Sequence, residues 1–499
     1  MENISSRREE RNFSLEEYLS RIESDKDCNQ EREPGDGKSP ASGAKEKQFE
    51  YVCRLVKEVF DGEWNDTDDE VKRKRLEREK RAIMGAEEET AFYKEKIRAV
   101  LLERKVADSW YPPWFPSLPE AVFAELYGLS GLAGWAYDMN EELAASSSAK
   151  LIGDRLYYFI DGKCRLQPQR IDSRRRDQLK RALLLSTPAE RLEYGFHELY
   201  LHNGIRITIY SGHRTKENQE IMVFRKYVLE NYTFGELAEK GTIPEAAIPL
   251  FLAMIEAGFN IMCSGQVRSG KTTFLRVWQS HEDPELEGLV IATDPETPWH
   301  EIMPDAPIMQ LIADGDELKE MSKALLRGDN DYVILEEMRD AAAFSLALDI
   351  TSTGTMRSKV TVHDSSGINV PYKMASKIVD AYGGSLREHI AQVYRNFDYI
   401  FEFCQNPENR AKKILKGILE LAYDPVSDEI RATYICRYDF DSGKWRWNFH
   451  MDRVKREKTA EISASADKIL EILSALSGGR TIDEWTLKPA YYQRGSGRI

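Results

Sequence analysis

The chain has 499 residues, of which 41% are hydrophobic and 31% are charged, and its formal net charge is −14. This length exceeds one ordinary hydrophobic core, so two or three domains are expected. The acidic balance argues against a dedicated nucleic-acid binder. No apolar run approaches the roughly 20 residues of a membrane-spanning helix. The six cysteines are scattered without a C-x-x-C pair, which suits a reducing compartment. We therefore expect a cytoplasmic protein, with any membrane association peripheral or through partners.

The first part of the chain is polar and densely charged. Residues 1–48 cannot bury enough apolar surface to offset the entropy of ordering, so we expect a disordered segment or linker. Residues 49–116 are predicted to form a charged helical extension, because apolar residues recur at helical spacing between Phe49 and Phe60. The Pro-rich run WYPPWFP at 110–116 breaks this pattern.

A smaller α/β domain is expected next, over residues 117–232. Alternating apolar residues predict strands at 155–160, 205–210 and 221–226. A helix is predicted at 174–185, between the first two of these strands.

Residues 265–272 read GQVRSGKT, which is a complete G-x-x-x-x-G-K-[ST] phosphate-binding loop. The apolar run at 260–264 predicts a buried strand before it, and 272–279 predicts a helix whose N-terminus faces the phosphates. Lys271 is expected to reach the β- and γ-phosphates and Thr272 to bind Mg²⁺. The predicted nucleotide-binding residues are Gly265, Gln266, Val267, Arg268, Ser269, Gly270, Lys271, Thr272 and Thr273.

The loop lies in a segment, 233–425, in which strands alternate with helices. Strands are predicted at 289–292, 332–336 and 359–362, and this alternation implies a mostly parallel sheet. Residues 426–499 are predicted to form a C-terminal α+β section. The predicted fold class is therefore α/β: a RecA-like P-loop ATPase domain preceded by a smaller α/β N-terminal domain, with a charged, partly disordered N-terminal extension.

An apolar run at 332–335 is followed by Glu336 and Glu337. An acid at the end of such a strand holds the water shell of Mg²⁺ or polarises the attacking water in P-loop enzymes. The alternative is an ordinary buried strand with an acidic helix cap.

Several segments resemble, in the same order, motifs of the type II/type IV secretion ATPase superfamily. LEEMRD at 335–340 is similar to its Walker B segment, and the stretch 353–363, ending in His363, to its histidine box. DPE at 294–296 is similar to its aspartate box. Segments 204–207 and 223–227 resemble its N-terminal-domain motifs. Without a C-x-x-C zinc module, the chain looks closer to the conjugation and tight-adherence (Flp) pilus branch.

The resemblance implies an ATP-hydrolysing motor that powers assembly of a pilus or secretion apparatus, with ATP and Mg²⁺ as cofactors. It also implies a homo-hexamer, a membrane platform protein as partner and no direct nucleic-acid partner. Glu337 is then a metal-organising residue beside Thr272. Arg206 and Arg225 match arginines that reach the γ-phosphate, or they are plain strand-surface charges. His363 is a γ-phosphate sensor or a structural residue.

The chain departs from the family pattern at several positions. Arg268 replaces a loop glycine, and Arg357 replaces a glycine of the histidine box. Thr293 stands at the usual catalytic glutamate, which leaves Asp294 or Glu296 to activate water. Two alternatives stay open: a nucleotide-binding scaffold subunit with little hydrolysis, and a DNA-translocating RecA-like motor.

Overall fold

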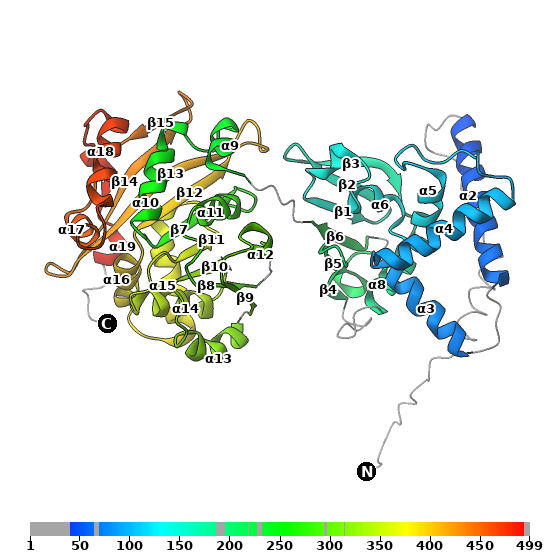
Figure 1. Cartoon of the computed structure of the whole chain (residues 1–499), viewed down its shortest axis with the longest axis horizontal. Helices are drawn as coiled ribbons and strands as arrows, with labels where there is room; N and C mark the ends of the chain where they lie inside the picture. The colour runs from blue at the N-terminus through cyan, green and yellow to red at the C-terminus, as the bar shows by residue number, and fades with distance from the viewer. Residues whose placement is uncertain are drawn as a thin grey trace, which may run out of the picture. The chain divides into compact units, whose positions relative to one another are not determined.

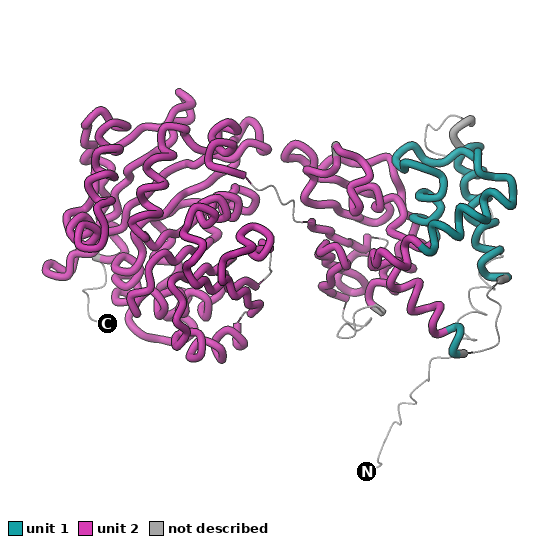
Figure 2. Tube along the Cα trace, in the orientation of Figure 1, with its two compact units in different colours: residues 1–72, 92–126 teal, residues 73–91, 127–499 magenta. Residues whose placement is uncertain are grey.

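The computed structural model describes residues 40–63, 69–185, 195–217, 219–226, 232–293, 297–313 and 315–493. The chain divides into two compact units (Figure 2). One unit contains residues 1–72 and 92–126, and the other contains residues 73–91 and 127–499. Over the described residues, no helix combines the length and the apolar character needed to cross a bilayer.

The first unit is helical. On α2, Val52, Val56 and Phe60 are buried at four-residue spacing, so they form one apolar stripe. The ring of Phe60 lies 6.3 Å from that of Tyr93. Helix α2 begins inside the stretch for which the sequence indicated a linker, because its apolar stripe has α4 to pack against. The helices are α2 (Pro40–Glu63), α3 (Asp69–Ile83), α4 (Glu87–Glu103) and α5 (Leu118–Tyr127), of which α3 and α4 continue into the second unit.

The second unit begins with an antiparallel sheet in the order β3-β2-β1-β6-β5-β4. Its strands alternate buried and exposed residues, as β5 does with Ile207 and Ile209 buried. The three strands predicted here are present. The elements are α6 (Ala133–Ala136), α7 (Glu141–Ala144), β1 (Ser148–Ile152), β2 (Arg155–Ile160), β3 (Lys163–Arg170), α8 (Ser173–Leu185), β4 (Phe196–Tyr200), β5 (Arg206–Tyr210) and β6 (Ile221–Arg225).

A second sheet contains a parallel core in the order β12-β7-β11-β10-β8-β9. Helices cover both of its faces (Figure 1). Helices α9–α11 pack on one hydrophobic core and α13–α16 on the other. This confirms the predicted RecA-like α/β domain. Its elements are α9 (Phe234–Glu239), α10 (Ile248–Glu256), β7 (Ile261–Gly265), α11 (Lys271–Gln279), β8 (Gly288–Ala292), α12 (Trp299–Ile302), β9 (Ile308–Ile312), α13 (Gly315–Leu325), β10 (Tyr332–Met338), α14 (Ala341–Ser352), β11 (Lys359–Val362), α15 (Val370–Tyr382), α16 (Leu386–Asn396) and β12 (Tyr399–Gln405).

The C-terminal strands extend this second sheet and do not form a sheet of their own. β13 pairs antiparallel with β12, and β14 pairs with β13 from Gly417↔Arg437 to Asp424↔Glu429. The boundary predicted at 425/426 therefore lies in the turn between two paired strands. The elements are β13 (Lys413–Asp424), β14 (Glu429–Asp439), β15 (Lys444–Trp447), α17 (Arg453–Ile462), α18 (Ser465–Ser477), β16 (Thr486–Leu487) and α19 (Ala490–Gln493).

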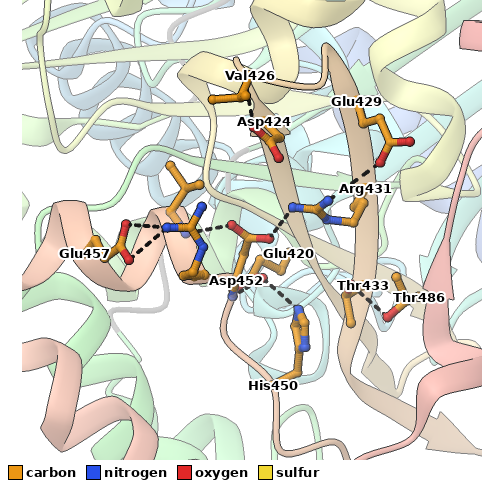
Figure 3. A network of polar contacts seen from close by, with 12 residues as sticks. Glu420, Asp424, Val426, Glu429, Arg431, Thr433, His450, Asp452, Glu457 and Thr486 are labelled. Carbon is orange, nitrogen blue, oxygen red and sulfur yellow. Dashed lines mark hydrogen bonds and ion pairs between the residues drawn. The ribbon is translucent and has the colours of Figure 1, made fainter.

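A polar network joins the C-terminal helices to this sheet (Figure 3). Glu420, whose side chain is 1% exposed, pairs with His450 at 3.3 Å. It also accepts hydrogen bonds from the Tyr399 hydroxyl at 3.0 Å and the Asp452 N–H at 2.8 Å. The Asp452 carboxylate in turn binds Arg431 and accepts from the N–H of Val454 in the first turn of α17. The start of α17 is thus fixed to β13 and β14.

We expect this network to make stability depend on pH through His450. Burial lowers the pKa of His450, but the hydrogen bond and charge of Glu420 outweigh that effect and raise it above 6.5. The stabilisation is therefore complete below the unfolded pKa of about 6.5 and is lost as pH rises through the folded pKa. His450→Gln should cost about 1.5 kcal/mol at pH 6 and less at pH 8.5. Thermal unfolding of both proteins across this range measures the difference, and a pH-independent difference would contradict it.

Candidate nucleotide-binding site

The phosphate loop leaves a buried strand and enters a helix, as predicted. All five residues of β7 are buried. A Cβ on Gly265 would lie 2.3 Å from the carbonyl oxygen of Phe403, so only glycine fits at the start of the loop. Gly270 has φ +95° and directly precedes α11. The N-terminus of α11 therefore opens onto the loop, where free N–H groups favour an anion.

Two arginines occupy positions where the resemblance led us to expect glycine. Arg268 has φ +61° and Arg357 has φ +58°. A non-glycine residue in this left-handed region costs roughly 1–2 kcal/mol. Both arginines thus keep the left-handed backbone conformation that glycine would adopt, and each also carries a cationic side chain.

Lys271 is held by the loop itself. Its side chain donates to the carbonyl oxygens of Gly265 at 3.1 Å and Gln266 at 2.9 Å. Its Nζ also lies 3.2 Å from Nδ1 of His363. The residue is only 5% exposed, so the amine is already aimed at the loop before any phosphate is bound.

His363 connects Lys271 to Glu337, an acid near the carboxyl end of β10. Its Nε2 lies 3.3 Å from Oε1 of Glu337. The Glu337 N–H donates to the Thr361 hydroxyl at 2.7 Å, and its carboxylate pairs with Arg339. Burial raises the pKa of Glu337, but the His363 hydrogen bond and the charges of Arg339, His363 and Lys271 lower it below its usual range. Glu337 is therefore ionised at neutral pH.

These groups share one cavity of about 250 Å³. Arg225 of β6 contributes to its wall, so this predicted arginine is brought to the loop. The cavity is lined by Ser147, Arg225, Lys226, Val267, Arg268, Ser269, Gly270, Lys271, Thr272, Thr273, Arg276, Glu337 and His363.

Other predicted site residues lie elsewhere. Arg206 faces Arg225 across the β5–β6 pair, but its guanidinium binds Glu198 at 2.7 Å on the neighbouring strand. Arg206 is not among the residues that line the cavity. Asp294 and Glu296 lie outside the described residues, which resume at Thr297. Gln266 is exposed on the loop.

The residues at the cavity fit a Mg²⁺ ion bound together with phosphates. Mg²⁺ prefers hard oxygen ligands and usually takes only one or two from the protein. The Thr272 hydroxyl and the ionised Glu337 carboxylate line the same cavity. No cluster of three or more His, Cys, Asp or Glu side chains suited to a metal occurs within the described part of the chain.

Sequence reasoning missed several groups near the loop. Arg276 lines the cavity from the second turn of α11. Glu282, just beyond α11, lies 2.7 Å from Lys359 and 2.5 Å from Arg357. Arg276 could have been found from its spacing, since it follows Thr272 by four residues and so lies on the same face of α11. Nothing local in the sequence pairs Glu282 with residues of the histidine box.

The parallel sheet, the phosphate loop at its carboxyl edge and the acid near the end of β10 define a RecA-like P-loop domain. Residues 214–421 match the family model described as "Type II/IV secretion system protein". Residues 214–421, about two fifths of the chain, are therefore similar to the type II/IV secretion system proteins.

Two curated relatives give the level of similarity. A probable conjugal transfer protein TrbB of Sinorhizobium fredii is 24% identical over 209 residues, covering 40% of this chain and 62% of the relative. A type IV secretion system protein VirB11 of Bartonella quintana is 28% identical over 176 residues, covering 33% of this chain and 46% of the relative. The chain thus spans about half to three fifths of these relatives' length.

Two solved structures are also similar. The VirB11 ATPase of the Brucella suis type IV secretion system, in complex with sulphate, is 14% identical, with a TM-score of 0.31 over 60% of this chain and 98% of that chain. The pilus retraction motor PilT with bound ADP is 14% identical, with a TM-score of 0.42 over 72% of this chain and 96% of that chain.

Proposed function

We propose that this chain binds Mg·ATP on the loop at 265–272 and hydrolyses it to power assembly of a pilus or secretion apparatus. The observation that carries the proposal is the contact series from Lys271 through His363 to Glu337, on a phosphate loop within a secretion-ATPase domain. The series places a cation, a titratable ring and an ionised acid around one cavity. A cation at the phosphates and an acid that holds Mg²⁺ are two parts that phosphoryl transfer uses in P-loop enzymes.

In this mechanism each residue of the cavity has a separate role. Lys271 leaves the loop carbonyls and stabilises the β- and γ-phosphates, together with the N–H groups of the loop. Thr272 and Glu337 would hold Mg²⁺, which would supply charge neutralisation at the phosphates. His363 lies between Lys271 and Glu337. In this proposal it senses whether a γ-phosphate is bound and acts on both side chains. Arg225 adds a further cation at the cavity wall, while Arg206 stabilises the sheet through Glu198.

We further propose a homo-hexamer acting at the inner face of a membrane, with a membrane platform protein as partner and no direct nucleic-acid partner. Steady-state ATP hydrolysis by the purified chain, with and without Mg²⁺ and duplex DNA, tests the activity. Mg²⁺-dependent turnover that ignores DNA supports the proposal, and stimulation by DNA would favour a DNA-translocating motor. Light scattering with a Mg·ATP analogue tests the ring, which a monomer under all nucleotide conditions would contradict.

A nucleotide-binding scaffold is the second candidate. Thr293, a hydroxyl residue, stands where the resemblance led us to expect the catalytic glutamate. Arg268 replaces a loop glycine, and Thr355 stands at the first histidine of the histidine box. A scaffold would bind ATP with little turnover.

Glu296→Gln distinguishes these two candidates. A water-activating carboxylate must lie within hydrogen-bond reach of the attacking water, directly or through one water. Thr293 cannot be that base, and Glu296 has a longer reach than Asp294. If Glu296 is the base, Glu296→Gln should slow kcat by about 100-fold and leave ATP binding intact.

Thr293→Glu is the companion variant, because it restores the family's usual acid. It should raise turnover or leave it unchanged. If neither substitution changes a wild-type rate that is already near zero, the scaffold replaces the motor.

A further inference from the structure

Two cationic side chains flank the phosphate loop in addition to Lys271. Arg268 belongs to the loop, and Lys413 is the first residue of β13. A Cβ on Gly270 would lie 3.3 Å from the Cβ of Lys413, so the stem of Lys413 packs directly on the loop. The Lys413 amine donates to the carbonyl oxygen of Arg410 at 2.6 Å.

These two cations are close together and only partly solvated. Burial and then the charge of Arg268 lower the pKa of Lys413 to about 8. Burial also lowers the pKa of Arg268. Among the described residues, neither Arg268 nor Lys413 has a side-chain nitrogen within 4.0 Å of a carboxylate. Both side chains are donors only, so the fold leaves them without an anion.

The backbone at Arg268 adds a second argument. Its φ of +61° is strained for any residue with a Cβ, and strain of this kind concentrates at ligand sites. Glycine would relieve the strain and remove the charge. The guanidinium itself packs on the ring of Phe159, 4.0 Å from its centroid, so the side chain lies beside the loop.

A cavity of about 730 Å³ is lined by Arg268 and Lys413. It shares Ser147, Arg268, Gly270, Thr273 and Arg276 with the cavity at Lys271, so the two cavities adjoin. We propose that Arg268 and Lys413 bind the diphosphate part of the nucleotide and set the affinity of the site for ADP as well as ATP. This inference rests on the proposed nucleotide binding and assigns a role to a residue, Arg268, that stands in place of a family glycine.

The proposal predicts a specific pattern of affinities. Arg268→Gly and Lys413→Met should each weaken binding of ADP and of inorganic pyrophosphate by about tenfold or more, the effect of losing one charge-assisted hydrogen bond. Isothermal titration calorimetry on the full chain measures both ligands. Arg268→Gly should unfold at the same or a higher temperature than the wild type, because the strain is gone. Lys444→Met removes an exposed lysine of β15 and should change neither affinity.

The pH dependence of affinity gives a further readout. An anion stabilises the protonated amine, so ADP affinity should fall as pH rises from 7.5 to 9.5, through the region of the Lys413 pKa of about 8. Lys413→Arg should keep the affinity and lose this dependence. The other charged groups that line the Lys413 cavity are Asp161, Glu239, Lys240, Arg268, Arg276 and Lys412.

The outcomes separate the two proposals. A wild type that binds neither ADP nor pyrophosphate overturns nucleotide binding itself. A wild type that binds both, with Arg268→Gly and Lys413→Met unchanged, overturns only the role of these two residues. If the variants bind ADP more weakly but bind pyrophosphate unchanged, the proposed role in diphosphate binding is also overturned, because the side chains would then contact the nucleoside.

Discussion

Lys271→Ala is expected to reduce ATP turnover by at least about 100-fold, the effect of removing one preorganised donor from a charged transition state. The amine now binds the carbonyl oxygens of Gly265 and Gln266 and lies beside His363. Alanine carries no amine, so the substitution leaves the phosphates without that cation. ATP affinity should fall as well, and a steady-state assay with titration of ATP measures both effects.

The control is Lys444→Ala, which removes an exposed lysine from β15 and should keep the wild-type rate. Circular dichroism should show that Lys271→Ala is folded. Wild-type turnover in a folded Lys271→Ala protein would exclude the loop at 265–272 as the site of hydrolysis.

Glu282→Gln is expected to cost about 3–5 kcal/mol of stability, the effect of breaking a buried ion pair from one side. The side chains of Glu282 and Lys359 are 1% and 0% exposed, and their charged atoms lie 2.7 Å apart. Arg357 binds the other oxygen of Glu282 at 2.5 Å. The glutamine amide would leave the buried Lys359 amine and the partly exposed Arg357 guanidinium without a carboxylate. Chemical denaturation of the variant and the wild type measures the loss.

The deficit of Glu282→Gln should shrink as pH rises. Burial lowers the pKa of Lys359 to about 8 even beside Glu282. Without the carboxylate the pKa falls further, so the unfolded chain binds more protons than the folded chain between that pKa and about 10.4. The stability of the variant therefore rises with pH in this window. Its deficit shrinks only up to about pH 8, because above the wild-type pKa of Lys359 both proteins gain stability in parallel.

Glu282→Gln combined with Lys359→Met provides the matched test of the ion pair. The double variant should recover part of the lost stability, because an apolar side chain then replaces the stranded charge. A deficit that is the same with and without Lys359→Met, and at every pH, would contradict the ion-pair explanation.

The two ends of α11 are both tied to β11. Lys271, at the start of the helix, contacts His363, just after the strand. Glu282, beyond the end of the helix, contacts Lys359 at the start of the strand. Arg357 joins this contact from the position of a family glycine. The phosphate loop is thus held between two fixed points, which favours a preorganised site.

Local features of the sequence were enough to predict the class of protein and the nucleotide loop. A phosphate loop is contiguous, so the eight residues from Gly265 to Thr272 carry their chemistry in their own order. The alternation of apolar runs with helical segments is also a local property, and it predicted the parallel sheet. The positive φ at Arg268 could not be predicted from the residue type, because arginine, unlike glycine, rarely adopts this backbone conformation.

Only the tertiary structure decided which distant residues meet. His363 lies between Lys271 and Glu337 because β11 is placed beside both β7 and β10 in the sheet. Of the two predicted arginines, Arg225 lines the cavity and Arg206 binds Glu198. Lys413 reaches the loop because β13 returns antiparallel along β12, which is itself paired with β7. Such contacts depend on strand order and register, which are set by packing between segments far apart in the chain, and no local pattern of residue types encodes them.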